Sequence, residues 1–203
     1  MSLWAVLPVK PLRQGKTRLS GVLTDNERYV LNLTLLGNTL NALRKVSLVQ
    51  QILVVSRDAE VLSVSRDFGV RTFQEEHPSN LNQAVTLGVR FAVAGLAKGV
   101  LVLPADLPLL EPRHLQAIGD RFTGDNQLVI VPDRRDDGTN AMMIAPPTAV
   151  EFQFGPGSFR RHILAAEKQG LAVEIARVPG LSLDLDIPED LDALRASILF
   201  QPQ

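Results

Sequence analysis

Short apolar runs that alternate with helix-patterned segments are the feature that most constrains the fold of this chain. Residues 3–7, 52–55 and 100–103 are continuous apolar runs of strand length, which is typical of strands buried on both faces of a sheet. After the first run, residues 24–27 fit a capping box, and the segment behind them carries apolar side chains at steps of three and four. Strands alternating with helices predict an α/β fold whose mostly parallel sheet is covered by helices on both faces.

The rest of the chain continues this alternation. A length of 203 residues suits one domain, residues 1–203, and no internal repeat or linker interrupts the sequence. Ser158 is expected to be the N-cap of a further helix. We also expect helices over residues 59–68, 80–97, 112–122 and 188–198, and strands over residues 70–73, 127–131, 141–144, 172–176 and 182–185.

The composition excludes several classes of function. A formal net charge of -1 argues against general nucleic-acid or membrane-surface binding. The absence of cysteine excludes disulfides, thiolate metal sites and cysteine nucleophiles. No apolar stretch has the length of a membrane span, and no basic region precedes the first apolar run, so we expect a cytoplasmic protein. The apolar helical face of residues 29–43 could serve a homodimer as easily as a core.

A basic loop follows the first predicted strand. Four cations and no acid fall within residues 10–18, namely Lys10, Arg13, Lys16 and Arg18. Loops at the carboxyl ends of parallel strands are where α/β sheets bind ligands, so this loop predicts an anion site. The Gly15-Lys16-Thr17 segment resembles the end of a P-loop, but Lys10 stands where the P-loop needs a further glycine. A solvated basic loop is the alternative.

Three aspartates are candidate ligands of Mg²⁺. Asp106 comes just after the apolar run 100–103, where rigid backbone would orient it. Asp184 and Asp186 are two residues apart, so on a strand they point to the same face and repel one another unless a cation neutralises them. A turn aspartate is the alternative for Asp106, and a helix N-cap is the alternative for Asp186. Neither alternative accounts for Asp184.

A glycine-rich turn precedes the helix that Ser158 opens. Residues 154–161 read FGPGSFRR, which places Arg160 and Arg161 in the first helical turn, where cations oppose the helix dipole. That placement is favourable if an anion binds at the helix start, and ordinary capping with solvated arginines is the alternative. The sequence thus offers cations for phosphates and carboxylates for a metal, without an evident protein nucleophile. This combination indicates phosphoryl or nucleotidyl transfer.

Taken together, these segments resemble the guanylyltransferases of coenzyme F-420 biosynthesis. The matching pieces run from Pro8 to Leu191 and are PVKPLRQGKTRL, LNQA, LPADLPLL, DGTN, FGPGSFRRH and LDLDIPEDL. The resemblance implies a Rossmann-like, three-layer nucleotidyltransferase fold with a mixed sheet. It also implies that a small phosphorylated acid, phosphoenolpyruvate or 2-phospho-L-lactate, attacks the α-phosphate of GTP and that pyrophosphate leaves.

The resemblance assigns roles to individual residues. Thr139, Gly155 and Ser158 would bind the phosphorylated acid, and Asp106, Asp184 and Asp186 would bind Mg²⁺. The nucleotide would be bound by Lys10, Lys16, Arg18 and Asn82, and the catalytic residues would be Lys16, Arg18 and Asp106. Two alternatives remain open. One is a nucleotidyltransferase of the same fold that uses CTP or a sugar phosphate, and the other is a non-catalytic nucleotide-binding module.

Overall fold

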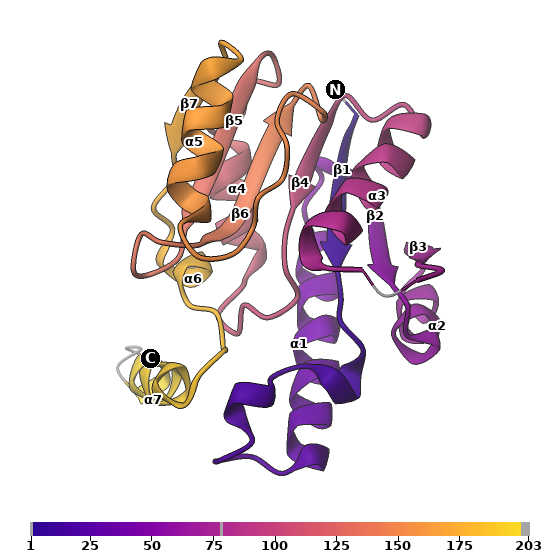
Figure 1. Cartoon of the computed structure of the whole chain (residues 1–203), viewed down its shortest axis with the longest axis vertical. Helices are drawn as coiled ribbons and strands as arrows, with labels where there is room; N and C mark the ends of the chain where they lie inside the picture. Colours follow the sequence, from indigo (N-terminus) through magenta and orange to yellow (C-terminus); the bar gives the residue numbers. More distant parts are fainter. Residues whose placement is uncertain (1, 78, 200–203) are drawn as a thin grey trace.

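A computed structural model describes residues 2–77 and 79–199, with side chains to residue 197. The described residues form a seven-stranded sheet with the order β3-β2-β1-β4-β6-β5-β7 (Figure 1). The strands are β1 (Leu3–Pro8), β2 (Val49–Ser56), β3 (Arg71–Gln74), β4 (Gly99–Val102), β5 (Gln127–Pro132), β6 (Thr139–Ala145) and β7 (Ala172–Ile175). Only β6 runs antiparallel to its neighbours, β4 and β5. The predicted α/β fold with a mostly parallel mixed sheet is confirmed.

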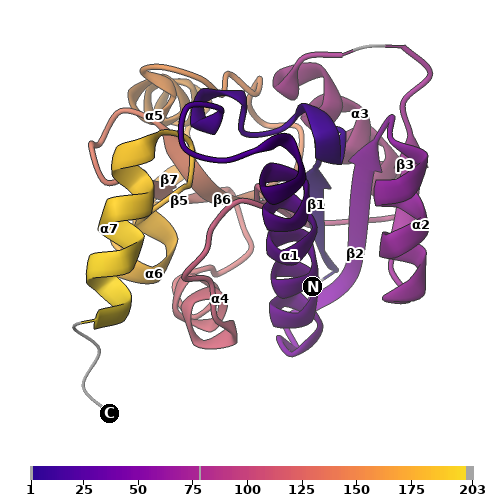
Figure 2. The ribbon, with the colours of Figure 1, turned by 90° about the horizontal axis from the view of Figure 1, so that it is seen from below.

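Helices lie on both faces of this sheet (Figure 2). They are α1 (Asp25–Arg44), α2 (Ala59–Asp67), α3 (Leu81–Ala94), α4 (Pro112–Gly119), α5 (Ser158–Lys168), α6 (Pro179–Ser182) and α7 (Pro188–Leu199). Because side chains alternate along a strand, β1 serves two cores. Leu3, Ala5 and Leu7 pack with α1, α2 and α4, whereas Trp4 and Val6 pack with α3 and α5. The three-layer prediction is therefore confirmed.

The edge at which β1 and β4 end is where a site can form. β1 lies between β2 and β4 and is parallel to both, so the order of the strands reverses at this point. Ligands of open α/β sheets bind in the crevice at such a reversal. β6 is antiparallel to β4, with Met142 opposite Val102, so the first residues of β6 reach the same edge. The loops after β1 and β4 and the start of β6 therefore meet.

Close packing fixes α3 beside this edge. A Cβ on Gly88 would lie 2.6 Å from Val6 Cγ1 and 2.7 Å from Val55 Cγ2, so only glycine lets the helix approach the sheet this closely. Asn80 caps α3 with a complete capping box, and Gly95 ends it, three residues short of the predicted helix end. None of the described helices is long and apolar enough to cross a membrane.

Two local predictions were wrong. Residues 182–185 do not form a strand, because the short helix α6 runs to Ser182 and an irregular segment follows it. The period-two pattern nevertheless holds there, since Leu183 and Leu185 are buried. Ser158 is not the N-cap of α5. Gly157 occupies the cap with a φ of 71°, and Ser158 is the first helical residue.

Candidate active site

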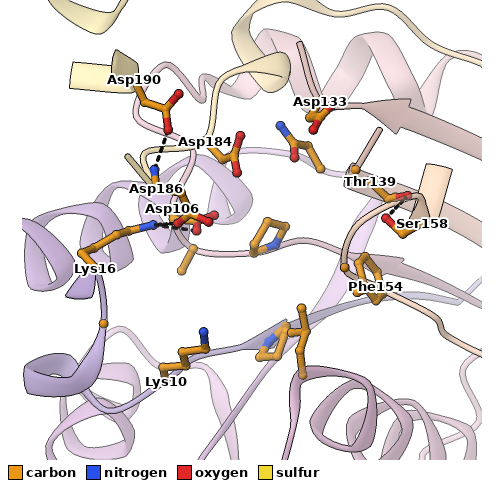
Figure 3. A pocket seen from close by; sticks show the side chains of 18 of the residues that line it. Lys10, Lys16, Asp106, Asp133, Thr139, Phe154, Ser158, Asp184, Asp186 and Asp190 are labelled. Atoms are coloured by element: carbon orange, nitrogen blue, oxygen red, sulfur yellow. Dashed lines mark hydrogen bonds and ion pairs between the residues drawn. The ribbon is translucent and has the colours of Figure 1, made fainter. Parts of the chain in front are cut away.

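One pocket collects the predicted site residues at the sheet edge (Figure 3). It encloses about 450 Å³ and lies between the loop after β1, the loop after β4, the start of β6 and the turn before α5. Its lining includes nine of the ten predicted site residues, which are Lys10, Lys16, Arg18, Asp106, Thr139, Gly155, Ser158, Asp184 and Asp186. The tenth, Asn82, lines a neighbouring pocket instead.

Lys16 joins two of the carboxylates. Its Nζ lies 2.7 Å from Asp106 Oδ2 and 3.0 Å from Asp186 Oδ1, and only 6% of its side chain is exposed. Burial by itself lowers the pKa of the Lys16 ammonium, but the charges of Asp106 and Asp186 outweigh this effect and raise the pKa. Lys16 also has a φ of 57°, which is uncommon for a residue with a Cβ. The loop conformation thus places a buried cation between two metal-ligand candidates.

Among the described residues Asp184 has no ion-pair partner, and its carboxyl group has the most perturbed pKa of the pocket. Burial, and then the negative charges of Asp106 and Asp186, raise the pKa of Asp184 from 3.8 to about 6. The buried neighbours Leu183 and Leu185 hold this segment, and the Leu185 backbone N–H donates to the Asp106 carbonyl over 3.3 Å. The segment therefore runs beside the loop after β4, and this brings the three carboxylates to one wall of the pocket.

The start of α7 is fixed by an interaction that the sequence did not reveal. Asp190 is buried, and its Oδ2 accepts hydrogen bonds from the backbone N–H groups of Asp186 and Ile187, at 2.8 and 2.9 Å. Its Oδ1 lies 2.6 Å from Arg134 Nη2. Asp190 therefore holds the backbone that carries Asp186. The position of Asp190 in a first helical turn was a signal for a capping role, whereas no signal pointed to Arg134 as its partner.

The carboxylate wall fits a divalent cation that arrives with a substrate. No described residue donates a hydrogen bond to Asp106 Oδ1, although this oxygen is buried, so it retains an acceptor for a cation. Within residues 2–77 and 79–199, no three acidic, histidine or cysteine side chains are already gathered as a set of metal ligands. Mg²⁺ needs no such cage, because it usually takes one or two carboxylates together with phosphate oxygens and water. Lys16 meanwhile supplies the positive charge.

The opposite wall of the pocket presents hydroxyl groups. Ser158 Oγ donates to Thr139 Oγ1 over 3.2 Å, and this bond takes the place of the expected N-cap interaction. Thr139 Oγ1 also lies 3.0 Å from His162 Nδ1, and all three side chains are buried. Thr139 stands at the start of β6 and Ser158 at the start of α5, so two elements bring these hydroxyls together. Small polar groups thus face the carboxylate wall (Figure 3).

Two side chains clamp the turn that carries Gly155. Asn82 accepts a hydrogen bond from the Phe154 backbone N–H at 2.6 Å and donates to its carbonyl at 3.2 Å. The exposed Arg161 donates to the carbonyls of Gln153 and Pro156, so its guanidinium supports the turn. Gly155 itself has a φ of 121°, a conformation that requires glycine.

The other two predicted cations, Lys10 and Arg18, line the pocket with exposed side chains. Lys10 extends into the pocket from the loop directly after β1 (Figure 3). Arg18 lies in the second of two short 3-10 turns, η1 (Leu12–Gln14) and η2 (Thr17–Leu19). Within the described part of the chain, neither Lys10 nor Arg18 forms an ion pair. These short turns replace the helix that a P-loop would require. Both cations are therefore available to an anionic ligand.

The fold is that of known nucleotidyltransferases. A nucleotidyl transferase of Methanothermobacter thermautotrophicus has the same fold, with a TM-score of 0.68, 15% identity and coverage of 98% of each chain. The family model "Guanylyl transferase CofC like" matches residues 3–196, and the chain belongs to this family. The predicted family, the enzyme class and guanylyl transfer are thereby confirmed.

Relatives with established names cover almost the whole chain. The phosphoenolpyruvate guanylyltransferase of Rubrobacter xylanophilus is 43% identical over 97% of this chain and 95% of its own length. That of Conexibacter woesei is 39% identical over 98% of this chain and 89% of its own length. The 2-phospho-L-lactate guanylyltransferase of Methanobrevibacter smithii is 29% identical over 93% of this chain and 82% of its own length.

Proposed function

We propose that this protein transfers GMP from GTP to phosphoenolpyruvate with release of pyrophosphate, in a Mg²⁺-dependent step of coenzyme F-420 biosynthesis. The observation that carries the proposal is the two-walled pocket. Carboxylates and Lys16 lie on one wall, and the Thr139 and Ser158 hydroxyls lie on the other, within about 450 Å³. One pocket can thus hold a triphosphate and a small phosphorylated acid side by side.

The charges of the pocket suit a transfer between two phosphorylated molecules. The phosphate of the acid is itself the nucleophile, so no protein nucleophile is needed. Lys10, Lys16 and Arg18 bind the phosphates of GTP and reduce the repulsion between the two anions. Asp106, Asp184 and Asp186 hold Mg²⁺, which supplies Lewis-acid stabilisation of the charge on the phosphates. Thr139, Ser158 and the Gly155 turn hold and orient the phosphorylated acid.

The similarities support phosphoenolpyruvate over 2-phospho-L-lactate. Two relatives named for phosphoenolpyruvate are 43% and 39% identical to this chain, whereas two relatives named for 2-phospho-L-lactate are 29% and 31% identical. The two acids differ at the carbon that bears the phosphate, which is planar in one and tetrahedral in the other. Discrimination therefore rests on the shape of the wall formed by Thr139, Ser158 and Gly155.

A substrate screen tests the proposal. Pyrophosphate release is measured with Mg²⁺ for each of the four nucleoside triphosphates against phosphoenolpyruvate, 2-phospho-L-lactate and a sugar phosphate, and product masses are read directly. We expect turnover with GTP and phosphoenolpyruvate above all other pairs. Turnover with CTP or a sugar phosphate instead, or nucleotide binding without turnover under any condition, would refute it.

A pair of matched variants tests the proposed metal ligand. Asp106→Asn removes one charge at the pocket and is expected to abolish turnover while the protein stays folded. Asp125→Asn makes the same change at an exposed position outside the pocket and is expected to leave turnover unchanged. Near-normal pyrophosphate release by Asp106→Asn would show that this residue is not a ligand of Mg²⁺.

A further inference from the structure

His162 is a buried polar side chain to which the proposed reaction assigns no role. It lies in α5 with no exposed surface, one turn after Ser158. One ring nitrogen, Nε2, is 2.9 Å from the Gln153 backbone nitrogen, and the other, Nδ1, is 3.0 Å from Thr139 Oγ1. The Phe154 ring packs against the imidazole with its centroid 4.9 Å away. The histidine therefore contacts both the hydroxyl wall and the turn that carries Gly155.

The backbone contact determines which nitrogen of His162 carries the proton. A backbone N–H can only donate, so Nε2 must be the unprotonated acceptor of the Gln153 N–H. The proton of the neutral ring is then on Nδ1 and points at Thr139 Oγ1. The opposite tautomer would place the Nε2–H against the Gln153 N–H, and the part-buried hydrogen bond between them would be lost. The geometry thus makes His162 a donor to Thr139.

A count of the hydroxyl protons then shows whether the Thr139–Ser158 pair donates a hydrogen bond into the pocket or only accepts one. Thr139 and Ser158 bring two protons, and their mutual hydrogen bond uses one of them, whichever hydroxyl donates. Because His162 donates to Thr139, it accepts neither proton. One hydroxyl proton is therefore left over, and both hydroxyls line the pocket. An anion, which only accepts hydrogen bonds, is the matching partner for that proton.

We propose that His162 is a positioning residue that makes the Thr139–Ser158 pair a hydrogen-bond donor toward an oxygen of the phosphorylated acid. The proposal rests on the proposed function, since it assigns that acid to this wall. The same ring holds Gln153 in place, and Gln153 leads into Phe154 and Gly155. The His162 side chain thereby determines both the hydrogen-bond direction of the two hydroxyls and the position of the turn beside them.

The electrostatic surroundings keep the ring neutral, as this arrangement requires. Burial, assisted by the charge of Arg161, lowers the pKa of His162 from 6.5 to about 4. A charged ring would carry a proton on Nε2 that faces the Gln153 N–H. At neutral pH the ring is therefore neutral, and the donor tautomer is its stable form.

The tautomer can be observed directly. The whole protein is labelled with ¹⁵N at histidine, and the two ring nitrogens of His162 are assigned by comparison with a His162→Leu sample. At pH 7.5 we expect a protonated, pyrrole-type shift for Nδ1 and a pyridine-type shift for Nε2. The reverse assignment would overturn the proposal without any measurement of activity.

Two variants test the consequence for the ligand. His162→Leu removes the ring donor, and His162→Asn returns an N–H near the position of Nδ1. Because a hydrogen bond to an anion is involved, we expect His162→Leu to raise KM for phosphoenolpyruvate by about 10- to 100-fold. The KM for GTP is expected to change little, and His162→Asn is expected to recover most of the loss. An unchanged KM for phosphoenolpyruvate in a folded His162→Leu protein would overturn the proposal.

Calorimetric binding of phosphoenolpyruvate separates this inference from the proposed function. If the wild type binds phosphoenolpyruvate without turning it over, the proposed function fails, and weaker binding by His162→Leu still supports the role of His162. If the wild type turns over and both variants bind phosphoenolpyruvate as it does, the inference fails alone. Should His162→Leu not fold, the ring nitrogens are assigned by comparison with the His162→Asn sample, and the tautomer of the wild type still decides the matter.

Discussion

Replacing Asp184 with asparagine is expected to stabilise the metal-free protein while it destroys the site. The folded state raises the pKa of this carboxyl group from 3.8 to about 6, a difference of about 2 units. At about 1.4 kcal/mol per unit, the ionised Asp184 costs the folded protein at most about 3 kcal/mol above pH 6. Solvent reaches part of the side chain, so we expect a gain of about 1–2 kcal/mol for Asp184→Asn.

The pH dependence of this gain follows from the direction of the shift. A carboxyl group whose pKa is raised by folding binds more protons in the folded than in the unfolded state between the two pKa values. Its contribution to stability is therefore fully present below pH 3.8 and is lost as the pH rises through about 6. Asparagine does not titrate. The difference between the wild type and Asp184→Asn should be largest near pH 8 and small near pH 4.

The assay is urea unfolding at several pH values in EDTA, followed by repetition with Mg²⁺ and GTP. We expect Asp184→Asn to unfold at higher urea than the wild type at pH 8 in EDTA, and to gain less from the ligands. Asp125→Asn serves as the control for loss of one exposed charge and should follow the wild type. A variant that is less stable than the wild type at pH 8 in EDTA, or a difference independent of pH, would refute the reasoning.

Three further predictions concern the supports of the site. Asn82→Ala removes two hydrogen bonds to Phe154 and should raise KM for the phosphorylated acid more than KM for GTP in steady-state kinetics. A larger rise in KM for GTP would mean instead that Asn82 contacts the nucleotide. Arg134→Met leaves buried Asp190 without its ion-pair partner and should cost about 1–3 kcal/mol in urea unfolding, and an unchanged midpoint would contradict this. Gly88→Ala places a Cβ against Val6 and should lower stability by about 1–3 kcal/mol, with an unchanged Tm as the contrary result.

The parts of the site that follow parallel strands could be predicted from sequence. The apolar runs of β1 and β4 identify buried strands, and the carboxyl ends of parallel strands share one edge of a sheet. The loops that carry Lys16 and Asp106 were therefore expected at one edge of the sheet, and the two side chains, 90 residues apart, form an ion pair of 2.7 Å there. The alternation at Leu183 and Leu185 placed Asp184 and Asp186 correctly as well. It did so although the segment is not a strand, because extended backbone has the same period.

The parts that depend on tertiary contacts could not be predicted. Serine before a helix is normally an N-cap, but at residue 158 the partner hydroxyl of Thr139 arrives from β6 and competes for it. A lone histidine gives no spacing signal, so the role of His162 emerges only when Gln153 and Thr139 are seen on opposite sides of its ring. Asn82 similarly reaches a backbone segment 72 residues away. Local rules fail at these positions because the competing partner is distant in sequence.

The pocket concentrates features that a stable protein would avoid elsewhere. Lys16 combines a buried ammonium with a left-handed backbone, and Asp184 is held close to two other carboxylates. Such strain persists only where the surrounding structure enforces it, as Asp190 does by holding the backbone of Asp186. A divalent cation would relieve the repulsion at Asp184 and release Lys16 to the phosphates, so both costs would fall when substrate and metal bind together. Relief of the repulsion at Asp184 and of the burial of Lys16 would therefore add to the affinity of the protein for Mg²⁺ and GTP.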